Sequence, residues 1–195
     1  MAEDSQVIGY FDIHEIFVAF NQLYFEGKLE RVTVEWSKRM TLCAGLCECC
    51  VVNKSCRIKL SEPLLLWRPI TDVVDTLLHE CIHAYLFITD SITDRDAHGR
   101  DFVYHMNRIN REAGSHITIY HSFTEQVEYY RQHHWKCTKC DWVVKRAMNR
   151  APSFKDPWWN IHQRRCDGQF YKVKQPPSYK KRSLGMLPLE TYFSK

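Results

Sequence analysis

Two histidines and a glutamate lie close together in a stretch of sequence that is otherwise almost entirely apolar. His79, Glu80 and His83 occur within TLLHECIHAYLFI. On a helix, His79 and His83 lie one turn apart on the same face, where both imidazoles can bind one Zn²⁺ at about 2.0–2.1 Å. Glu80 projects beside them and can accept a proton from a water molecule that zinc activates. The pattern predicts hydrolytic zinc chemistry, and the alternative is a chance HExxH sequence on a core helix.

A catalytic zinc site also needs a third protein ligand, and it leaves one position open for water. His98 is the best candidate, because the polar loop TDSITDRDAHG separates it from the helix and allows the chain to return to the same face. Three acidic residues are the alternative third ligands: Asp94, Asp96 and Asp101.

A second group of metal-ligating residues follows later in the chain. Cys137 and Cys140 are separated by two residues, and after 21 further residues His162 and Cys166 form a pair at helical spacing. Four ligands of this kind close the coordination sphere, so this set predicts a structural zinc site on which local folding depends. Asp156, followed by proline, is the expected N-cap of a short helix over residues 157–165. The chain is therefore expected to bind two zinc ions, one catalytic and one structural.

Charge is unevenly distributed along the chain, whose overall formal charge is +4. Residues 1–130 carry a balance of −7, whereas residues 131–182 carry +11. Aromatic side chains alternate with the basic ones in the second region, which is typical of grooves that bind single-stranded nucleic acid. The alternative is a solvated basic face. The predicted DNA-contacting residues are Trp142, Lys145, Arg146, Trp158, Trp159 and Arg164, and one of the two adjacent tryptophans is expected to face inward.

Periodicity predicts the elements that position these groups, and together they make an α+β fold. A small mixed β-sheet is expected from strands at residues 31–36, 40–46 and 56–60, with a further short strand at 117–120. Helices are expected over residues 12–25, 70–88, 99–113 and 125–133, the third ending at Gly114. The composition changes near His134, which predicts a boundary between a main domain over residues 1–133, which carries the first metal-ligating set, and a small zinc-binding β/α subdomain over 134–178, followed by a tail over 179–195.

Composition excludes several other classes of protein. The chain has 195 residues, of which 45% are hydrophobic, and it contains only 7 glycines and 7 prolines, so neither low-complexity disorder nor a collagen-like repeat is expected. No signal peptide or membrane span is expected from the sequence. The nine cysteines are odd in number and unevenly spread, which favours reduced thiols and metal ligation over a disulfide framework. The cytosol or the nucleus is the expected compartment.

With both metal-ligating sets in view, the chain resembles the SprT-like metalloprotease family, in particular its Spartan type. The matching stretches cover roughly residues 10–175: WSKRMTLCAG, RIKLSEPLL, DTLLHECIHAYLF, HGRDF, HMNRIN, ITIYHSF, VKRAMNR and WWNIHQRRC. The resemblance implies a zincin-like protease domain in which His79, His83 and His98 bind zinc and Glu80 is the general base. It also implies a zinc-binding subdomain that contacts DNA, with single-strand contacts at Arg146 and Trp158. The implied role is nuclear and chromatin-associated: cleavage of proteins covalently trapped on DNA, with DNA as the activator.

Two segments depart from the family pattern. The loop after the first cysteine pair of the subdomain is short and lacks a Pro- and Tyr-rich insertion, so that one stacking platform is either lost or replaced by Trp142. The segment from Cys43 to Cys56 is rich in cysteine, which indicates an extra metal site, a redox-sensitive loop or idle buried thiols.

The end of the chain, MLPLETYFSK, suggests a further partner. Leu189, Tyr192 and Phe193 have the spacing of the apolar plug with which ligands of the replication sliding clamp dock, and the alternatives are a tail that folds onto the body or has no partner. The sequence as a whole predicts a DNA-dependent zinc endopeptidase that cleaves DNA-bound proteins. The alternative is a non-proteolytic DNA-binding adaptor that has structural zinc sites and recruits partners to chromatin.

Overall fold

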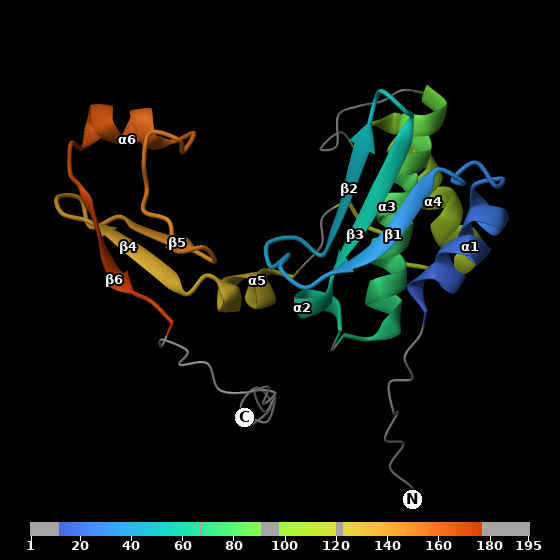
Figure 1. Ribbon diagram of the computed structural model, residues 1–195, viewed down its shortest axis with the longest axis horizontal. Coiled ribbons are helices and arrows are strands. Elements are labelled where there is room, and N and C mark those ends of the chain that lie inside the picture. Colours follow the sequence, from blue (N-terminus) through green and yellow to red (C-terminus); the bar gives the residue numbers. More distant parts are fainter. Residues whose placement is uncertain (1–11, 67, 91–97, 120–122, 177–195) are drawn as a thin grey trace, which may run out of the picture. The chain divides into compact units, whose positions relative to one another are not determined.

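The structure is a computed structural model that describes residues 12–66, 68–90, 98–119 and 123–176. The chain divides into two compact units, Met1–Tyr130 and Arg131–Lys195, whose elements are labelled in Figure 1. Within the described residues, no helix combines the length and the apolar character needed to cross a membrane.

The first unit contains five helices and three strands among its described residues, so its α+β class is as predicted. In chain order they are α1 (Ile13–Tyr24), β1 (Val32–Ser37), β2 (Gly45–Cys50), β3 (Ser55–Ser61), α2 (Glu62–Leu65), α3 (Ile70–Asp90), α4 (Arg100–Ala113) and α5 (Thr124–Tyr130).

The sheet of this unit is small and mixed, as expected, with strand order β1-β3-β2. β1 pairs with β3 in parallel, and β2 pairs with β3 in antiparallel fashion, with Cys49 opposite Cys56. β2 begins later than predicted, because residues 40–44 belong to a loop whose carbonyls accept hydrogen bonds from Ser61. The backbone N–H of Ser61 donates to the carbonyl of Ala44, and its hydroxyl donates to the carbonyl of Met40. β2 therefore starts only at Gly45, and it forms one edge of the sheet.

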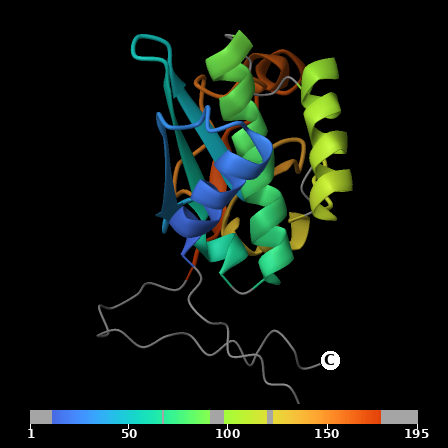
Figure 2. The same cartoon turned by 90° about the vertical axis from the view of Figure 1, so that its right-hand side faces the viewer.

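Helix α3 is the centre of the first unit. Twelve of its 21 residues are buried, and Leu78, Cys81 and Ile82 have no exposed surface. It packs against β2 and β3 on one side and against α4 on another, and Figure 2 shows it between the sheet and α4. Because apolar residues surround the helix, its three buried polar residues need specific partners: Thr76 donates to the carbonyl of Asp72, while His79 and Glu80 have partners outside the helix.

A side-chain cap begins α1, and the predicted glycine ends α4. The Asp12 side chain caps α1 by accepting a hydrogen bond from the backbone N–H of His14. After α1 the chain turns at Gly27, which has φ +72°. α4 ends at Gly114, whose left-handed conformation at φ +65° favours glycine.

Two predictions in the following segment were wrong. Residues 117–119, which were expected to begin a strand, form none; instead the side chain of Asn110 bonds both the N–H and the carbonyl of Ile117. The next helix, α5, ends at Tyr130 rather than near residue 133, because His133 already belongs to the first strand of the second unit.

Among its described residues, the second unit is a three-stranded antiparallel sheet with one short helix. Its elements are β4 (His133–Cys137), β5 (Val143–Arg146), α6 (Trp159–Arg165) and β6 (Phe170–Lys174), and the strand order is β5-β4-β6. α6 begins two residues later than predicted and Asp156 is not its N-cap, since its carboxylate pairs with Arg146 and Arg150 instead.

Candidate metal centres

Three imidazoles converge in the first unit. His79 and His83 lie one turn apart on α3, and His98 lies two residues before α4. The Nε2 atom of His79 is 3.2 Å from the Nε2 of His83 and 3.2 Å from the Nε2 of His98. Phe102, on the first turn of α4, packs against all three rings at centroid distances of 4.6 to 4.8 Å. The sequence separates these residues by up to 19 positions, and the packing of α4 on α3 brings them together.

The separations between the nitrogens fit a zinc ion at their centre. Two nitrogens at 2.0–2.1 Å from one tetrahedral ion are about 3.3 Å apart, close to the 3.2 Å observed. His79 also has the required tautomer, because its Nδ1 lies 2.8 Å from the carbonyl oxygen of Thr118. A carbonyl only accepts hydrogen bonds, so Nδ1 carries the proton and Nε2 presents a lone pair to the centre.

The alternative third ligands do not join this group among the described residues. Asp101 is exposed in the first turn of α4 and is not one of the three clustered donors. Asp94 and Asp96 lie outside the described residues.

A half-buried side chain, Asn110, supports the segment whose carbonyl holds His79. Asn110 of α4 donates from Nδ2 to the carbonyl of Ile117, and its Oδ1 accepts from the N–H of Ile117 and from the hydroxyl of Ser115. These three bonds fix the segment that leads directly to Thr118. No local pattern indicates this role, since Asn110 looks like any polar residue on an amphipathic helix.

Glu80 is buried beside the imidazoles and faces strand β2. Its residue exposure is 6%, and burial raises the pKa of its carboxyl to about 8. The backbone N–H of Cys47 donates to this carboxyl and partly opposes the effect of burial. A carboxyl that gains and loses its proton near neutral pH is suited to general acid–base chemistry.

Glycine is required at position 45 because Glu80 lies against the backbone there. A Cβ atom at Gly45 would be 2.5 Å from Oε1 of Glu80, 2.7 Å from its Cγ and 2.9 Å from its Cδ. The start of β2 therefore shapes the space for the carboxylate. Sequence reasoning did not identify Gly45, because the close approach arises from tertiary packing of α3 against β2.

The four predicted ligands in the second unit also come together. Cys137, Cys140, His162 and Cys166 present donor atoms that all lie within 4.8 Å of one another. The sulfurs of Cys137 and Cys166 are 3.7 Å apart, and Cys140 Sγ is 3.4 Å from His162 Nε2. A tetrahedral zinc ion with Zn–S bonds of 2.3 Å predicts about 3.8 Å and 3.6 Å for these separations.

The electrostatics of this group favour a thiolate. Burial raises the pKa of Cys137, but hydrogen bonds from the backbone N–H groups of Lys139 and Cys140 bring that pKa down to about 6. Gly168 leaves room for the sulfur, because a Cβ there would collide with Cys137 Sγ. The donor set therefore fits zinc by both geometry and charge.

Aromatic side chains gather beside this second group. Trp142 is 41% exposed and packs edge-on against Trp158 at 4.5 Å, and both contact Phe170. Trp158 and Trp159 are both half-buried, so the expectation that one of them faces inward does not describe the arrangement. They share the packing around Phe170, and each keeps part of its ring exposed.

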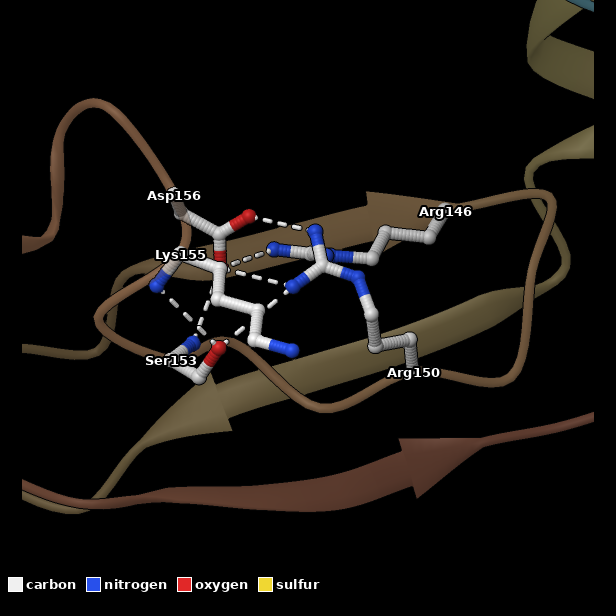
Figure 3. Close-up of polar contacts among 5 residues, drawn as sticks. All are labelled: Arg146, Arg150, Ser153, Lys155 and Asp156. Atoms are coloured by element: carbon white, nitrogen blue, oxygen red, sulfur yellow. Dashed lines mark hydrogen bonds and ion pairs between the residues drawn. The ribbon is translucent and has the colours of Figure 1, made fainter.

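The predicted basic residues differ in how accessible they are. Lys145 and Arg164 are exposed. The side chain of Arg146 is only 12% exposed and pairs at 2.7 Å with Asp156, whose side chain is 6% exposed. Figure 3 shows Arg146 and Arg150 both directed at this carboxylate, to which the backbone N–H of Ser153 also donates. Although desolvation opposes ionisation, the arginines hold the pKa of Asp156 well below its usual range.

The three residues of the predicted clamp-binding tail, Leu189, Tyr192 and Phe193, lie outside the described residues.

Comparison with known proteins finds two family matches. Residues 13–121 match the SprT-like family, and residues 132–172 match the Spartan-like zinc binding domain. The first match contains the imidazole group and Glu80, and the second contains the Cys-His group.

Curated relatives share about half of their aligned residues with this chain. A protein of Danio rerio named DNA-dependent metalloprotease SPRTN is 53% identical over 177 residues, which is 87% of this chain and 28% of the relative. The Homo sapiens protein of that name is 49% identical over 185 residues, covering 91% and 38% respectively. DNA-dependent metalloprotease dvc-1 of Caenorhabditis elegans is 48% identical over 178 residues, covering 86% and 48%. The chain thus spans less than half the length of these relatives.

Proposed function

The chain belongs to the SprT-like family, and from that premise we propose that it is a DNA-dependent zinc endopeptidase that cleaves proteins crosslinked to or tightly bound on DNA. The observation that carries this proposal is the convergence of three Nε2 atoms beside a buried glutamate on the same helix. The names of the relatives, which describe DNA-dependent metalloproteases, support the same function.

In this mechanism, His79, His83 and His98 would hold the catalytic zinc ion within a zincin-like domain. Zinc bound there would act as a Lewis acid that polarises the scissile carbonyl and lowers the pKa of the attacking water. Phe102 keeps the three rings in place, and the carbonyl of Thr118 keeps His79 in the tautomer that presents Nε2.

Glu80 would move the proton. Its carboxylate accepts a proton from the attacking water and then delivers it to the leaving amine. The Cys47 N–H fixes the carboxyl from the side of the sheet, and Gly45 leaves it the room it needs. Burial raises the affinity of Glu80 for the proton, so the group can hold it between the two transfers.

The second unit would bring the enzyme to DNA. Cys137, Cys140, His162 and Cys166 would hold a structural zinc ion that fixes the short α6 against the sheet. We propose that Trp142, Trp158 and Trp159 stack on unpaired bases, while Lys145 and Arg164 contact phosphates. Arg146 would act indirectly, since its pairing with Asp156 ties β5 to the turn that precedes α6.

Binding to the same DNA would concentrate enzyme and substrate, so that the cleavage site need not select a sequence. Tethering of this kind typically raises the effective concentration to the millimolar range. A protease that acts on DNA-bound proteins works where chromatin is, and we propose a nuclear, chromatin-associated location.

A paired cleavage assay tests the proposal. The zinc-loaded chain is incubated with a DNA-binding protein in the absence of DNA, with single-stranded DNA and with duplex DNA, and both protein and DNA are analysed on gels. We expect protein fragments that require DNA and are lost in Glu80→Gln, while the DNA stays intact and the variant still binds zinc and DNA. Cleavage at the wild-type rate by Glu80→Gln contradicts the mechanism, and shortened DNA identifies a nuclease instead.

The same assay distinguishes the adaptor hypothesis. A chain that binds DNA and two zinc ions but yields no fragments under any condition would be the non-proteolytic adaptor that the sequence left open.

A further inference from the structure

A third group of metal-ligating side chains lies on the sheet of the first unit, apart from both centres described above. Cys47 and Cys49 of β2 and Cys56 of β3 present sulfur atoms that all lie within 4.8 Å of one another. None of the nine cysteines, all of which the structure describes, takes part in a disulfide bond.

The pairing of the two strands produces this convergence. Cys47 and Cys49 are two residues apart on one strand, so both side chains lie on the same face of the sheet. Cys56 is directly opposite Cys49 in the antiparallel register and therefore shares that face. This is the face that packs into the core, where Cys47 and Cys56 are each only 3% exposed.

The separations resemble those of the Cys-His group in the second unit. The sulfurs of Cys47 and Cys49 are 3.5 Å apart, against about 3.8 Å for two thiolates on one tetrahedral zinc ion. The corresponding distance between Cys137 and Cys166 is 3.7 Å. Cys47 also lies within hydrogen-bonding reach of Cys56, so the three sulfurs form a closed triangle.

We propose that Cys47, Cys49 and Cys56 form a third metal site, which binds Zn²⁺ through three thiolates. Soft thiolate donors select zinc over magnesium or calcium. Cys49 is half-buried, unlike the other two, so a water molecule can reach the ion and complete a tetrahedron.

A metal at this place would also fix β2 next to the predicted active site. Cys47 would bind the ion through its sulfur, while its backbone N–H donates to Glu80. The third site goes beyond the proposed protease function and does not depend on it.

Zinc content tests the proposal. The intact chain, purified with all thiols reduced, is expected to hold three zinc ions per molecule by elemental analysis, and Cys49→Ser is expected to hold two. Cys50→Ser is the matched control, because this exposed neighbour on β2 is not one of the clustered donors and should leave the count at three. After exchange for Cd²⁺, the thiolate-to-metal absorption should fall by about half in Cys49→Ser, since two sites supply three thiolates each.

A measurement on the wild-type chain keeps the test independent of how the variants fold. Alkylation of Cys49, mapped by mass spectrometry, should slow markedly when the metal-free chain is loaded with zinc, whereas exposed Cys50 should react equally fast in both states.

Three results overturn the proposal. They are equal zinc content in the fully reduced wild-type chain and in Cys49→Ser, equal alkylation of Cys49 with and without zinc, and an intact mass two hydrogens lower because Cys49 and Cys56 form a disulfide. Each of these results concerns metal content or thiol chemistry, so none is confused with a failure to cleave proteins.

Discussion

Substitution of Gly45 by alanine should impair the proposed general base without removing either zinc ion of the proposed protease. The added Cβ would lie 2.5 Å from Oε1 of Glu80, whereas ordinary contacts begin at 3.4 Å. The carboxylate must therefore retreat by about 0.9 Å, the difference between these two distances. A displacement of roughly 1 Å in a catalytic group costs about 100-fold in rate, so we expect kcat to fall by about two orders of magnitude.

The assay for this variant is DNA-stimulated cleavage under single-turnover conditions, accompanied by zinc analysis and DNA binding. Zinc content and DNA affinity should match those of the wild type. Gly99→Ala is the control, because a Cβ there meets nothing within 4 Å. Since Gly45→Ala acts through Glu80, it should lower the residual rate of Glu80→Gln no further. Wild-type activity in Gly45→Ala would refute the placement of Glu80 against β2.

Further predictions concern pH, zinc affinity and stability. In the metal-free chain, the pKa of Glu80 is about 8, above its ordinary value of 4.5, so the folded state binds the proton more tightly than the unfolded state. The first unit should therefore lose stability as pH rises from about 4.5 to about 8, by on the order of 4 kcal/mol. Urea unfolding of wild type and Glu80→Gln at pH 5 and pH 8 measures this loss. An equal change in unfolding free energy in the two chains would contradict the prediction. Asn110→Ala should release the segment that holds His79 and weaken zinc binding about 10- to 100-fold, as measured by competition with a chelator. Unchanged zinc affinity would show that the segment keeps His79 in place without the Asn110 side chain. Asp156→Asn should destabilise the zinc-loaded second unit by about 3 kcal/mol, because Arg146 then remains buried without its carboxylate; chemical unfolding followed by tryptophan fluorescence gives the value, and a shift below the experimental error would count against the ion pair.

The features that the sequence predicted correctly depend on local periodicity and capping. Helix α3 was expected after Pro69 because its apolar pattern is long, and the structure begins it at Ile70. Gly114 was expected to end α4, and its positive φ does so. The convergence of His98 with His79 and His83 was anticipated because the polar loop lets the chain return to the same face of the helix.

The features that sequence reasoning missed arise from contacts between distant segments. The strand predicted at residues 117–120 had a suitable apolar pattern. The side chain of Asn110, however, bonds both the N–H and the carbonyl of Ile117, so these groups do not pair with a strand. Asp156 precedes a proline and looks like a helix cap, yet two arginines outside the helix take its carboxylate. The convergence of Cys47, Cys49 and Cys56 depends on a register that no local pattern specifies.

The most direct test of the account is anomalous diffraction at the zinc absorption edge from crystals of the reduced chain. We predict a peak in the first unit that lies 2.0–2.1 Å from the Nε2 atoms of His79, His83 and His98, with the carboxylate of Glu80 beside its remaining coordination position. The absence of a peak among these three imidazoles, or a fourth protein ligand that closes the site, would contradict the proposed catalytic centre.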